Sequence, residues 1–278
     1  MKKVVSLILL LIIAMMGTCL AEQAAEKPLG HLTKLGVEEA VLNAQIRSTF
    51  EEIPFSEYRY FDNLNSMVMA LDSGDIDGFL TNQYTYEFLR ARINRYSTFS
   101  TDPPYEYAYG YAMLLRQEDQ ELCNRITEAI REMKADGTLD ALKEQYIDKC
   151  IAGEEPAAVR PEVFDKPDTL TVALTGDLPP MDYFSAEGEP VGFNTALISE
   201  IGKRLAVNIE LISIDSGSRA VSLASGKSDV VFWTEAADYY NWDGAAQEDQ
   251  PENTLLTDIY LPAEIRIVVL KTFPAADP

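Results

Sequence analysis

The chain has 278 residues, of which 47% are hydrophobic, and a formal net charge of −22. An acidic balance of this size disfavours nucleic acid and anionic lipid as partners, because both repel negative charge. One histidine, His31, and cysteines without the spacing of metal ligands argue against a zinc site. The sequence therefore predicts no nucleic acid, no metal and no cofactor.

The amino terminus predicts a secretory signal. Two lysines precede an apolar run over 4–16, and small residues follow as far as Ala21. The apolar run is shorter than the roughly 20 residues that a membrane-spanning helix needs. We therefore expect removal of segment 1–21 and an extracytoplasmic protein, either periplasmic or secreted. Attachment to lipid through Cys19 is the alternative.

Helical and strand-like segments alternate over the first half of the chain. In order, we expect a helix at 37–52, a strand at 57–61, a helix at 64–71, a strand at 78–80, a helix at 84–94, a strand at 105–115, and helices at 121–135 and 139–146. The last helix is expected to run back along its predecessor. Cys123 and Cys150 would then lie close together, where an oxidising compartment favours a disulfide; two unpaired thiols are the alternative.

Segment 152–168 is rich in proline, alanine and charge and has no periodicity, which predicts a linker. After it the pattern restarts, with strands at 170–174, 207–214 and 264–270, a helix from Asn194 to 204, and a second helix ending near 225. Strands that alternate with helices are typical of mainly parallel sheets covered on both faces. The predicted fold class is α/β.

A seven-residue pattern occurs twice. Residues 71–77 and 223–229 both read Leu-x-Ser-Gly-x-x-Asp, and each is followed by an apolar stretch that ends in a polar residue. A repeat over half the chain length indicates two similar lobes and not an array of short repeats. Parallel sheets bind ligands at the carboxyl ends of their strands, so a cleft between the lobes is the expected site.

The second half of the chain resembles the opening of bacterial extracellular solute-binding proteins of family 3, the polar amino-acid type. The resemblance rests on strand 170–174, the Pro-Pro-Met-Asp-Tyr sequence at 179–183, and Gly-Phe-Asn at 192–194 before a helix. Residues 122–146 look like the closing helix pair of that family, and 255–260 like its crossing strand. The resemblance implies two Rossmann-like lobes with a hinge and an interlobe cleft, the type II fold of periplasmic binding proteins.

These family segments stand in reversed order, which suggests a circular permutation. The predicted division is lobe two at 30–104 and 262–278, lobe one at 105–151 and 169–261, with 152–168 joining the old ends. Permutation is tolerated when the original termini lie close together. A fragment of a tandem array, or a domain-swapped dimer in which a partner completes the lobes, is the alternative.

The family's usual ligand anchors are missing here. No arginine occurs over 234–242, where the family's carboxylate-binding Arg is expected, and Asn82 replaces its amine-binding Asp. Losing two charge-assisted contacts would weaken the binding of a simple amino acid by roughly 3–6 kcal/mol. Arg219 is the candidate replacement, because it stands at a helix start where an anion is favoured. A solvent-facing Arg219 paired with an acid is the alternative.

The predicted contacts lie at strand ends in both lobes, and Asn82 is expected to face Trp233 across the cleft. Asp182 and Glu235 are candidates to receive a ligand amine, with exposed acids as the alternative, and core packing is the alternative for Trp233. The full set of predicted ligand contacts is Asn82, Gln83, Tyr84, Asp182, Tyr183, Ser216, Ser218, Arg219, Trp233, Thr234 and Glu235.

The resemblance implies a binding protein that captures a small polar ligand, an amino acid or a related compound, for the permease of an ABC-type transporter. No nucleophile and base stand together in the sequence, so we do not expect an enzyme. A ligand-sensing module of a receptor is one alternative. A dehydratase-like enzyme with Glu235 or Asp182 as general acid is the other.

Overall fold

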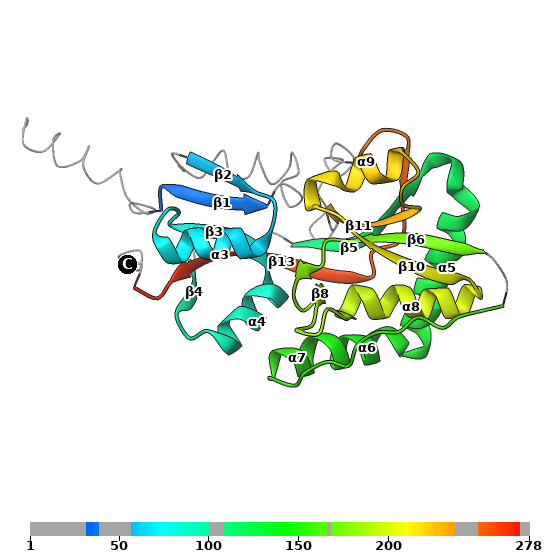
Figure 1. Cartoon of the computed structure of the whole chain (residues 1–278), viewed down its shortest axis with the longest axis horizontal. Helices are drawn as coiled ribbons and strands as arrows, with labels where there is room; N and C mark the ends of the chain where they lie inside the picture. Colours follow the sequence, from blue (N-terminus) through cyan, green and yellow to red (C-terminus); the bar gives the residue numbers. More distant parts are fainter. Residues whose placement is uncertain (1–31, 39–56, 100–107, 166–167, 237–249, 273–278) are drawn as a thin grey trace, which may run out of the picture.

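The computed structural model describes residues 32–38, 57–99, 108–165, 168–236 and 250–272. Two lobes lie side by side and share one long sheet (Figure 1). No helix within these ranges has the length and apolar character needed to cross a membrane. The predicted signal at 1–21 lies outside the described residues.

Lobe two holds the blue and cyan elements of Figure 1 together with the end of the last strand. Its elements are β1 (Lys34–Glu38), β2 (Glu57–Phe61), α3 (Leu64–Ser73), β3 (Gly78–Asn82), α4 (Gln83–Arg92), β4 (Tyr96–Phe99) and the second half of β13 (Leu261–Leu270). Every residue of β3 is buried, because β3 lies between β1 and β13 and is covered by helices.

Lobe one is larger and holds the green to orange elements of Figure 1. Its main sheet contains β5 (Ala108–Arg116), β6 (Thr169–Leu174), β10 (Asn208–Ser213), β11 (Val230–Ala236) and β12 (Thr254–Leu256). Its helices are α5 (Gln120–Asp136), α6 (Thr138–Lys143), η2 (Glu144–Asp148), α7 (Lys149–Ile151), α8 (Phe193–Leu205) and α9 (Arg219–Ala224), with the short turns η1 (Gln117–Asp119) and η3 (Ser216–Ser218). A small sheet of β7 (Asp177–Leu178), β8 (Asp182–Phe184) and β9 (Pro190–Val191) follows β6.

The strands of the two lobes have the same order and the same relative directions. In lobe two, β1 lies between β2 and β3 in parallel, and β13 runs antiparallel to β3 and then to β4. In lobe one, β6 lies between β10 and β11 in parallel, and β5 runs antiparallel to β11 and then to β12. The predicted two-lobed α/β fold is therefore confirmed, and the lobes are duplicates in topology.

The repeated Leu-x-Ser-Gly-x-x-Asp pattern makes matching hydrogen bonds in the two lobes. The amide of Asp77 donates to the carbonyl of Lys34 (2.9 Å), and its carboxylate accepts from the amide of Lys34 (2.8 Å). The amide of Asp229 donates to the carbonyl of Thr171 (2.8 Å), and its carboxylate accepts from the amide of Thr171 (3.0 Å). Each aspartate thus fixes the first strand of its lobe, which gives the repeat a structural role.

The two crossing strands join the lobes. Residues Leu261 to Glu264 of β13 pair with β5 in lobe one, and Ile265 to Val269 pair with β3 in lobe two. The main hydrophobic core continues through this junction from lobe one into lobe two. Lobe two also has a core of its own between α3, α4 and the sheet. Any change in the angle between the lobes must therefore bend β13, whose pairing passes from β5 to β3.

The expected helix at 37–52 was wrong at its start. Val37 lies in β1, the central strand of lobe two, and is fully buried together with Leu35. The strand has only five residues, Lys-Leu-Gly-Val-Glu, so the alternation of Leu35 and Val37 with polar residues and glycine is too short to distinguish it from the start of a helix. Residues 39–56 lie outside the described part of the chain. Residues 152–165 contain no helix or strand, and the amide of Val159 donates to the carbonyl of Pro190 in lobe one. That segment 152–168 links permuted ends stays a prediction.

The expected disulfide was also wrong, because Cys123 and Cys150 are both free and buried. After Gly137, the helices α6, η2 and α7 leave α5 and run along α8 towards α4 (Figure 1). The thiol of Cys123 donates to the carbonyl of Leu256 (3.6 Å), whereas Cys150 lies against Tyr183 at the border of the lobes.

Gly192, just before α8, should be the glycine least tolerant of substitution. Its φ is +110°, and an added Cβ would lie 2.4 Å from the carbonyl oxygen of Met181. We expect Gly192→Ala to lower the free energy of unfolding by roughly 3 kcal/mol. Gly188→Ala is the matched control, since its φ of +78° is also positive but nothing lies within 4 Å, and it should cost about 1 kcal/mol. Urea unfolding followed by circular dichroism measures both; equal losses would contradict the steric argument.

Candidate ligand site between the lobes

The start of α3 in lobe two is held by lobe one. The amide of Leu64, the first residue of the helix, donates to Oδ2 of Asp177 (3.0 Å). The hydroxyl of Ser216 donates to the carbonyl oxygen of Asp62 (3.1 Å). Asp177 and Ser216 stand just after the carboxyl ends of β6 and β10, and Asp62 just after β2. The strand ends of the two lobes therefore meet, as expected for a site between parallel sheets.

Asp177 is the residue in this region that the predicted contacts omit. Burial raises the pKa of its carboxyl group, and the negative charge of Asp182 adds to the rise, against the hydrogen bond from Leu64. The rule that ligands gather at strand ends covers the loop from 177 to 184, so a signal for Asp177 existed. No local pattern selects Asp177 over the other acids, because its partner amide is 113 residues away.

Asp182 is buried within lobe one and only 3% exposed. Its Oδ1 accepts from the amide and hydroxyl of Thr175 (3.1 and 2.9 Å) and from the amide of Gly176 (3.0 Å). Its Oδ2 accepts from Nδ2 of Asn194 (2.8 Å). The alternative of an exposed acid was therefore wrong. These donors tie the turn after β6 to the start of α8.

Arg219 and Trp233 pack on each other at the strand ends of lobe one. The guanidinium carbon of Arg219 lies 4.8 Å from the centre of the Trp233 ring. Nε of Arg219 donates to the carbonyl of Ser216 (3.2 Å), and Nη1 donates to the carbonyl of Phe232 (3.0 Å). Arg219 is half-buried, and its role as a replacement clamp stays a prediction, as does the alternative of a solvent-facing arginine paired with an acid. Ser218 is exposed, and Trp233 and Thr234 are half-buried.

The predicted contacts of lobe two are used within the protein. Asn82 is 3% exposed and caps α4, with Oδ1 accepting from the amide of Thr85 (2.8 Å) and Nδ2 donating to its hydroxyl (2.9 Å). The side chain is directed to its own helix, so the expectation that Asn82 faces Trp233 was wrong. A helix-capping role requires the same side chain as a ligand contact, and the sequence did not separate the two.

The two residues after Asn82 attach α4 to the crossing strand. The hydroxyl of Tyr84 donates to the carbonyl of Pro262 (2.8 Å), and burial raises the pKa of Tyr84 to about 12. The side-chain oxygen of Gln83 accepts from the amide of Glu264. Glu235 pairs with Gly110 through its backbone, and its side chain lies outside the described part of the structure, as do residues 237–242.

A second contact between the lobes involves Tyr183. Its ring meets the edge of Phe88 on α4, with 6.0 Å between ring centres, and its hydroxyl lies 3.5 Å from the Cys150 thiol. Arg92 lies over Phe88 (3.6 Å) and donates to the carbonyl of Cys150 (3.0 Å). Burial raises the pKa of Tyr183. This contact holds α4 of lobe two against α7 and β8 of lobe one.

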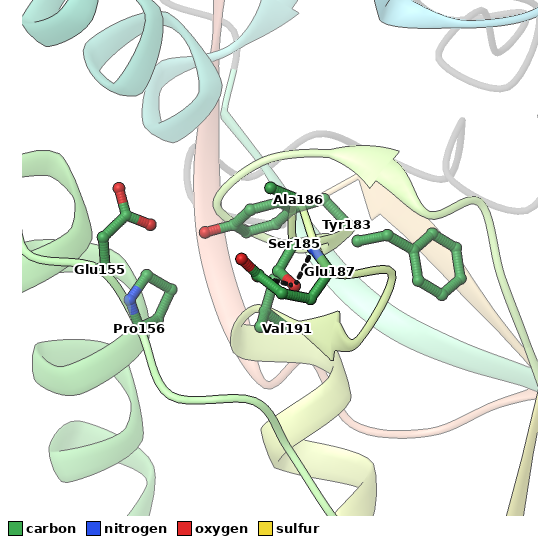
Figure 2. Close-up of a pocket in the computed structure, with 8 residues that line it drawn as sticks. Glu155, Pro156, Tyr183, Ser185, Ala186, Glu187 and Val191 are labelled. Atoms are coloured by element: carbon green, nitrogen blue, oxygen red, sulfur yellow. Dashed lines mark hydrogen bonds between the residues drawn. The ribbon is translucent and has the colours of Figure 1, made fainter.

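A cavity of about 450 Å³ lies beside this contact, between the linker and the β8–β9 hairpin (Figure 2). Tyr183 is the predicted contact that lines it. The other lining residues are Glu155, Pro156, Phe184, Ser185, Ala186, Glu187 and Val191. Figure 2 shows Glu155 and Pro156 on one side and the hairpin on the other. Within the described ranges, no three acidic, histidine or cysteine side chains are grouped as metal ligands.

Residues 170–236 match the bacterial extracellular solute-binding proteins, family 3. This match confirms, over that segment, the resemblance carried by the Pro-Pro turn and the Gly-Phe-Asn before α8. It covers the strands β6, β10 and β11, and with them Asp177, Ser216 and Arg219. No curated protein has a sequence that matches this chain.

Several solved structures are similar in outline. The ligand-binding component of an ABC-type import system from Staphylococcus aureus, with zinc bound, has 12% identity and a TM-score of 0.42 over 85% of this chain and 65% of that one. The GluR0 ligand-binding core in complex with L-glutamate has 12% identity and a TM-score of 0.42, over 87% and 86%. The alkanesulfonate-binding protein SsuA from Xanthomonas axonopodis pv. citri, bound to MOPS, has 11% identity and a TM-score of 0.38, over 87% and 66%. This chain thus spans less than two thirds of the S. aureus protein, and at such identities these ligands carry no argument here.

The raised pKa of Asp177 predicts a pH-dependent stability. A carboxyl group whose pKa is higher in the folded than in the unfolded state costs stability once the pH rises above the folded pKa. Asp177→Asn removes that cost. The difference in unfolding free energy, variant minus wild type, should therefore increase as the pH rises from about 3 to about 7. Urea unfolding at a series of pH values measures it; a difference that stays constant or increases towards acid would contradict the assignment.

Proposed function

Because residues 170–236 belong to the bacterial extracellular solute-binding proteins, family 3, we propose that this protein captures a small polar ligand between its lobes. The protein would act outside the cytoplasm, and its partner would be the permease of an ABC-type transporter. The observation that carries the proposal is the meeting of strand ends across the lobes, where Asp177 and Ser216 contact the turn from Asp62 to Leu64. A ligand placed there would touch both lobes.

Movement about β5 and β13 would couple ligand binding to closure. These strands are the covalent and hydrogen-bonded connection between the lobes, and contacts on one side of them can open while the sheet remains intact. Among the described residues, two hydrogen bonds join the start of α3 to lobe one. They can break while the core that continues through the junction and the separate core of lobe two stay intact. Closure around a ligand is therefore compatible with the fold.

Lobe one would supply most of the direct contacts. Trp233 and Thr234 lie on β11 and Ser218 lies in the η3 turn after β10, all with exposed or half-exposed side chains, and Arg219 packs on the Trp233 ring. Such a ring can stack on a planar ligand or attract a cation. The cleft offers rings, hydroxyl groups and amides, which suit complementarity to a stable ligand more than to a transition state. Binding without conversion follows.

A ligand screen tests this function. The purified protein should melt at a higher temperature with at least one member of a panel of amino acids, amines, short peptides and aromatic acids, because a ligand that binds only the folded state stabilises it. Trp233→Ala should lower the affinity for that ligand by about tenfold, as measured by titration calorimetry. Val163→Ala, which shortens an exposed side chain in segment 152–168, is the control and should leave the affinity unchanged.

Two results would contradict the proposal: a panel without any stabilising member, or conversion of the ligand at a rate proportional to the protein. Mass spectrometry of the recovered ligand distinguishes the second case. The variant Asp182→Asn would then ask whether that acid takes part in the conversion, as in the dehydratase-like alternative.

We also propose that the chain is a circular permutant. Lobe one draws on residues on both sides of the linker, since β5 pairs with β11 and α5 packs against α8. In lobe two, Leu35 of β1 and Val269 of β13 both pair with Gly78, on opposite sides of β3. They lie about 10 Å apart, at two strand spacings. The present ends of lobe two are therefore close, as permutation requires.

A reordered chain tests the permutation. It would begin at Thr169, run to Pro278, continue through a flexible Gly-Ser linker into residue 32, and end at Ile151. We expect cooperative unfolding at a midpoint close to that of the parent chain, because the strand pairings are kept. The matched control is a chain whose new termini lie inside α5, between Glu128 and Ala129. It should not fold, because the break interrupts a helix. If both chains behave alike, the proposal is contradicted.

A further inference from the structure

The contact between Asp177 and α3 has the chemistry of an anion site. The first amide of a helix has no partner within the helix, and the helix dipole favours negative charge at that end. Here the side chain of the cap residue Asn63 accepts a hydrogen bond from the amide of Ser66 (2.9 Å). The amide of Leu64 instead donates to the carboxylate of Asp177 in the other lobe. The protein thus supplies its own anion at this helix start.

The neighbouring donor comes from the same lobe. Ser216 donates to the carbonyl of Asp62, directly before the cap residue. The turn from Asp62 to Leu64 is therefore engaged by an acceptor and a donor of lobe one. This pair of bonds joins lobe one to the start of α3 through the protein's own groups.

The charge around Asp177 is unbalanced. Among the described residues, neither Asp177 nor Asp182 takes part in an ion pair, and the two lie on the paired strands β7 and β8, one register position apart. Burial and the charge of Asp182 raise the pKa of Asp177, which is the response expected of a carboxylate short of positive charge. A second carboxylate brought here by a ligand would meet repulsion, and a ligand cation would be attracted.

From this geometry we propose that Asp177 is a specificity-determining residue of the interlobe site. Its carboxylate takes the position at the start of α3 that a ligand carboxylate would otherwise occupy, so the site selects compounds that present an amine, amidine or guanidine group and lack a carboxylate. The inference rests on the proposed function of the cleft and adds the class of ligand. Nε and Nη1 of Arg219 donate to the carbonyls of Ser216 and Phe232 in lobe one, so these two donors are not directed to the start of α3.

Matched pairs of compounds test the selection, since each pair differs by one carboxylate: arginine and agmatine, lysine and cadaverine, ornithine and putrescine. Titration calorimetry on wild type should give at least about tenfold tighter binding of the decarboxylated member in one or more pairs. Asp177→Asn keeps the shape of the side chain and removes its charge. It should bring the ratio of the two dissociation constants in a pair close to one. Asp168→Asn, the same change at an exposed position on the start of β6, should leave the ratio as in wild type.

A second measurement is independent of any ligand. Spin labels at Met69 on α3 and Val221 on α9, both exposed, report the distance between the lobes. Wild type should give a narrow distance distribution without ligand, and Asp177→Ala, which removes the acceptor for Leu64, should shift it to longer distances. The same distribution in wild type and Asp177→Ala would overturn the bridging role.

Three binding results would overturn the selection. They are tighter binding of the amino acid in wild type, an unchanged ratio in Asp177→Asn, and no binding of any member. If the amino acid binds more tightly and Arg219→Ala abolishes that preference, Arg219 is the anion clamp. If no member binds but a compound of another class in the wider screen binds and depends on Trp233, the ligand class is wrong and the proposed function stands.

Discussion

The pairing of β5 with β13 is the constraint on which the rest of the structure depends. Each strand begins in one lobe's sheet and hydrogen-bonds to the other strand where the lobes meet. Because both strands cross at the same place, the parallel strands of both lobes end on facing sides. The turn from Asp62 to Leu64 and the loops with Asp177 and Ser216 meet only for this reason.

Two neighbouring acids show how the same residue type serves different purposes. Asp182 is enclosed by four donors of its own lobe, which satisfies its charge locally and leaves it a structural role. Asp177 has its cross-lobe partner on a separate body, so its hydrogen bond depends on the angle between the lobes. Hydrogen bonding to charged groups is worth about 1.5–3 kcal/mol, which is large enough to bias an opening equilibrium and small enough to be broken by a ligand.

The absence of the usual family anchors from this sequence has a physical consequence in the structure. At the position of the amine-binding acid, Asn82 caps α4 and contributes no charge to the cleft. Arg219 is held by two backbone carbonyls and the ring of Trp233. On the lobe-one side of the described interface, Asp177 and Asp182 add two carboxylates to a chain with a net charge of −22.

The sequence by itself determined the two-lobed α/β fold, the linker and the family of residues 170–236. It did so because the repeat, the alternation of helices with strands, and the Pro-Pro and Gly-Phe-Asn turns are local patterns. The tertiary structure decided the rest: β1 as a strand, the separation of Cys123 from Cys150, the capping role of Asn82 and the partnership of Asp177 with Leu64. Each of these depends on residues far apart in the chain, or on whether a polar side chain is satisfied by its own helix or by another lobe. Local composition does not encode that choice, because it is made by the packing of elements around the crossing strands.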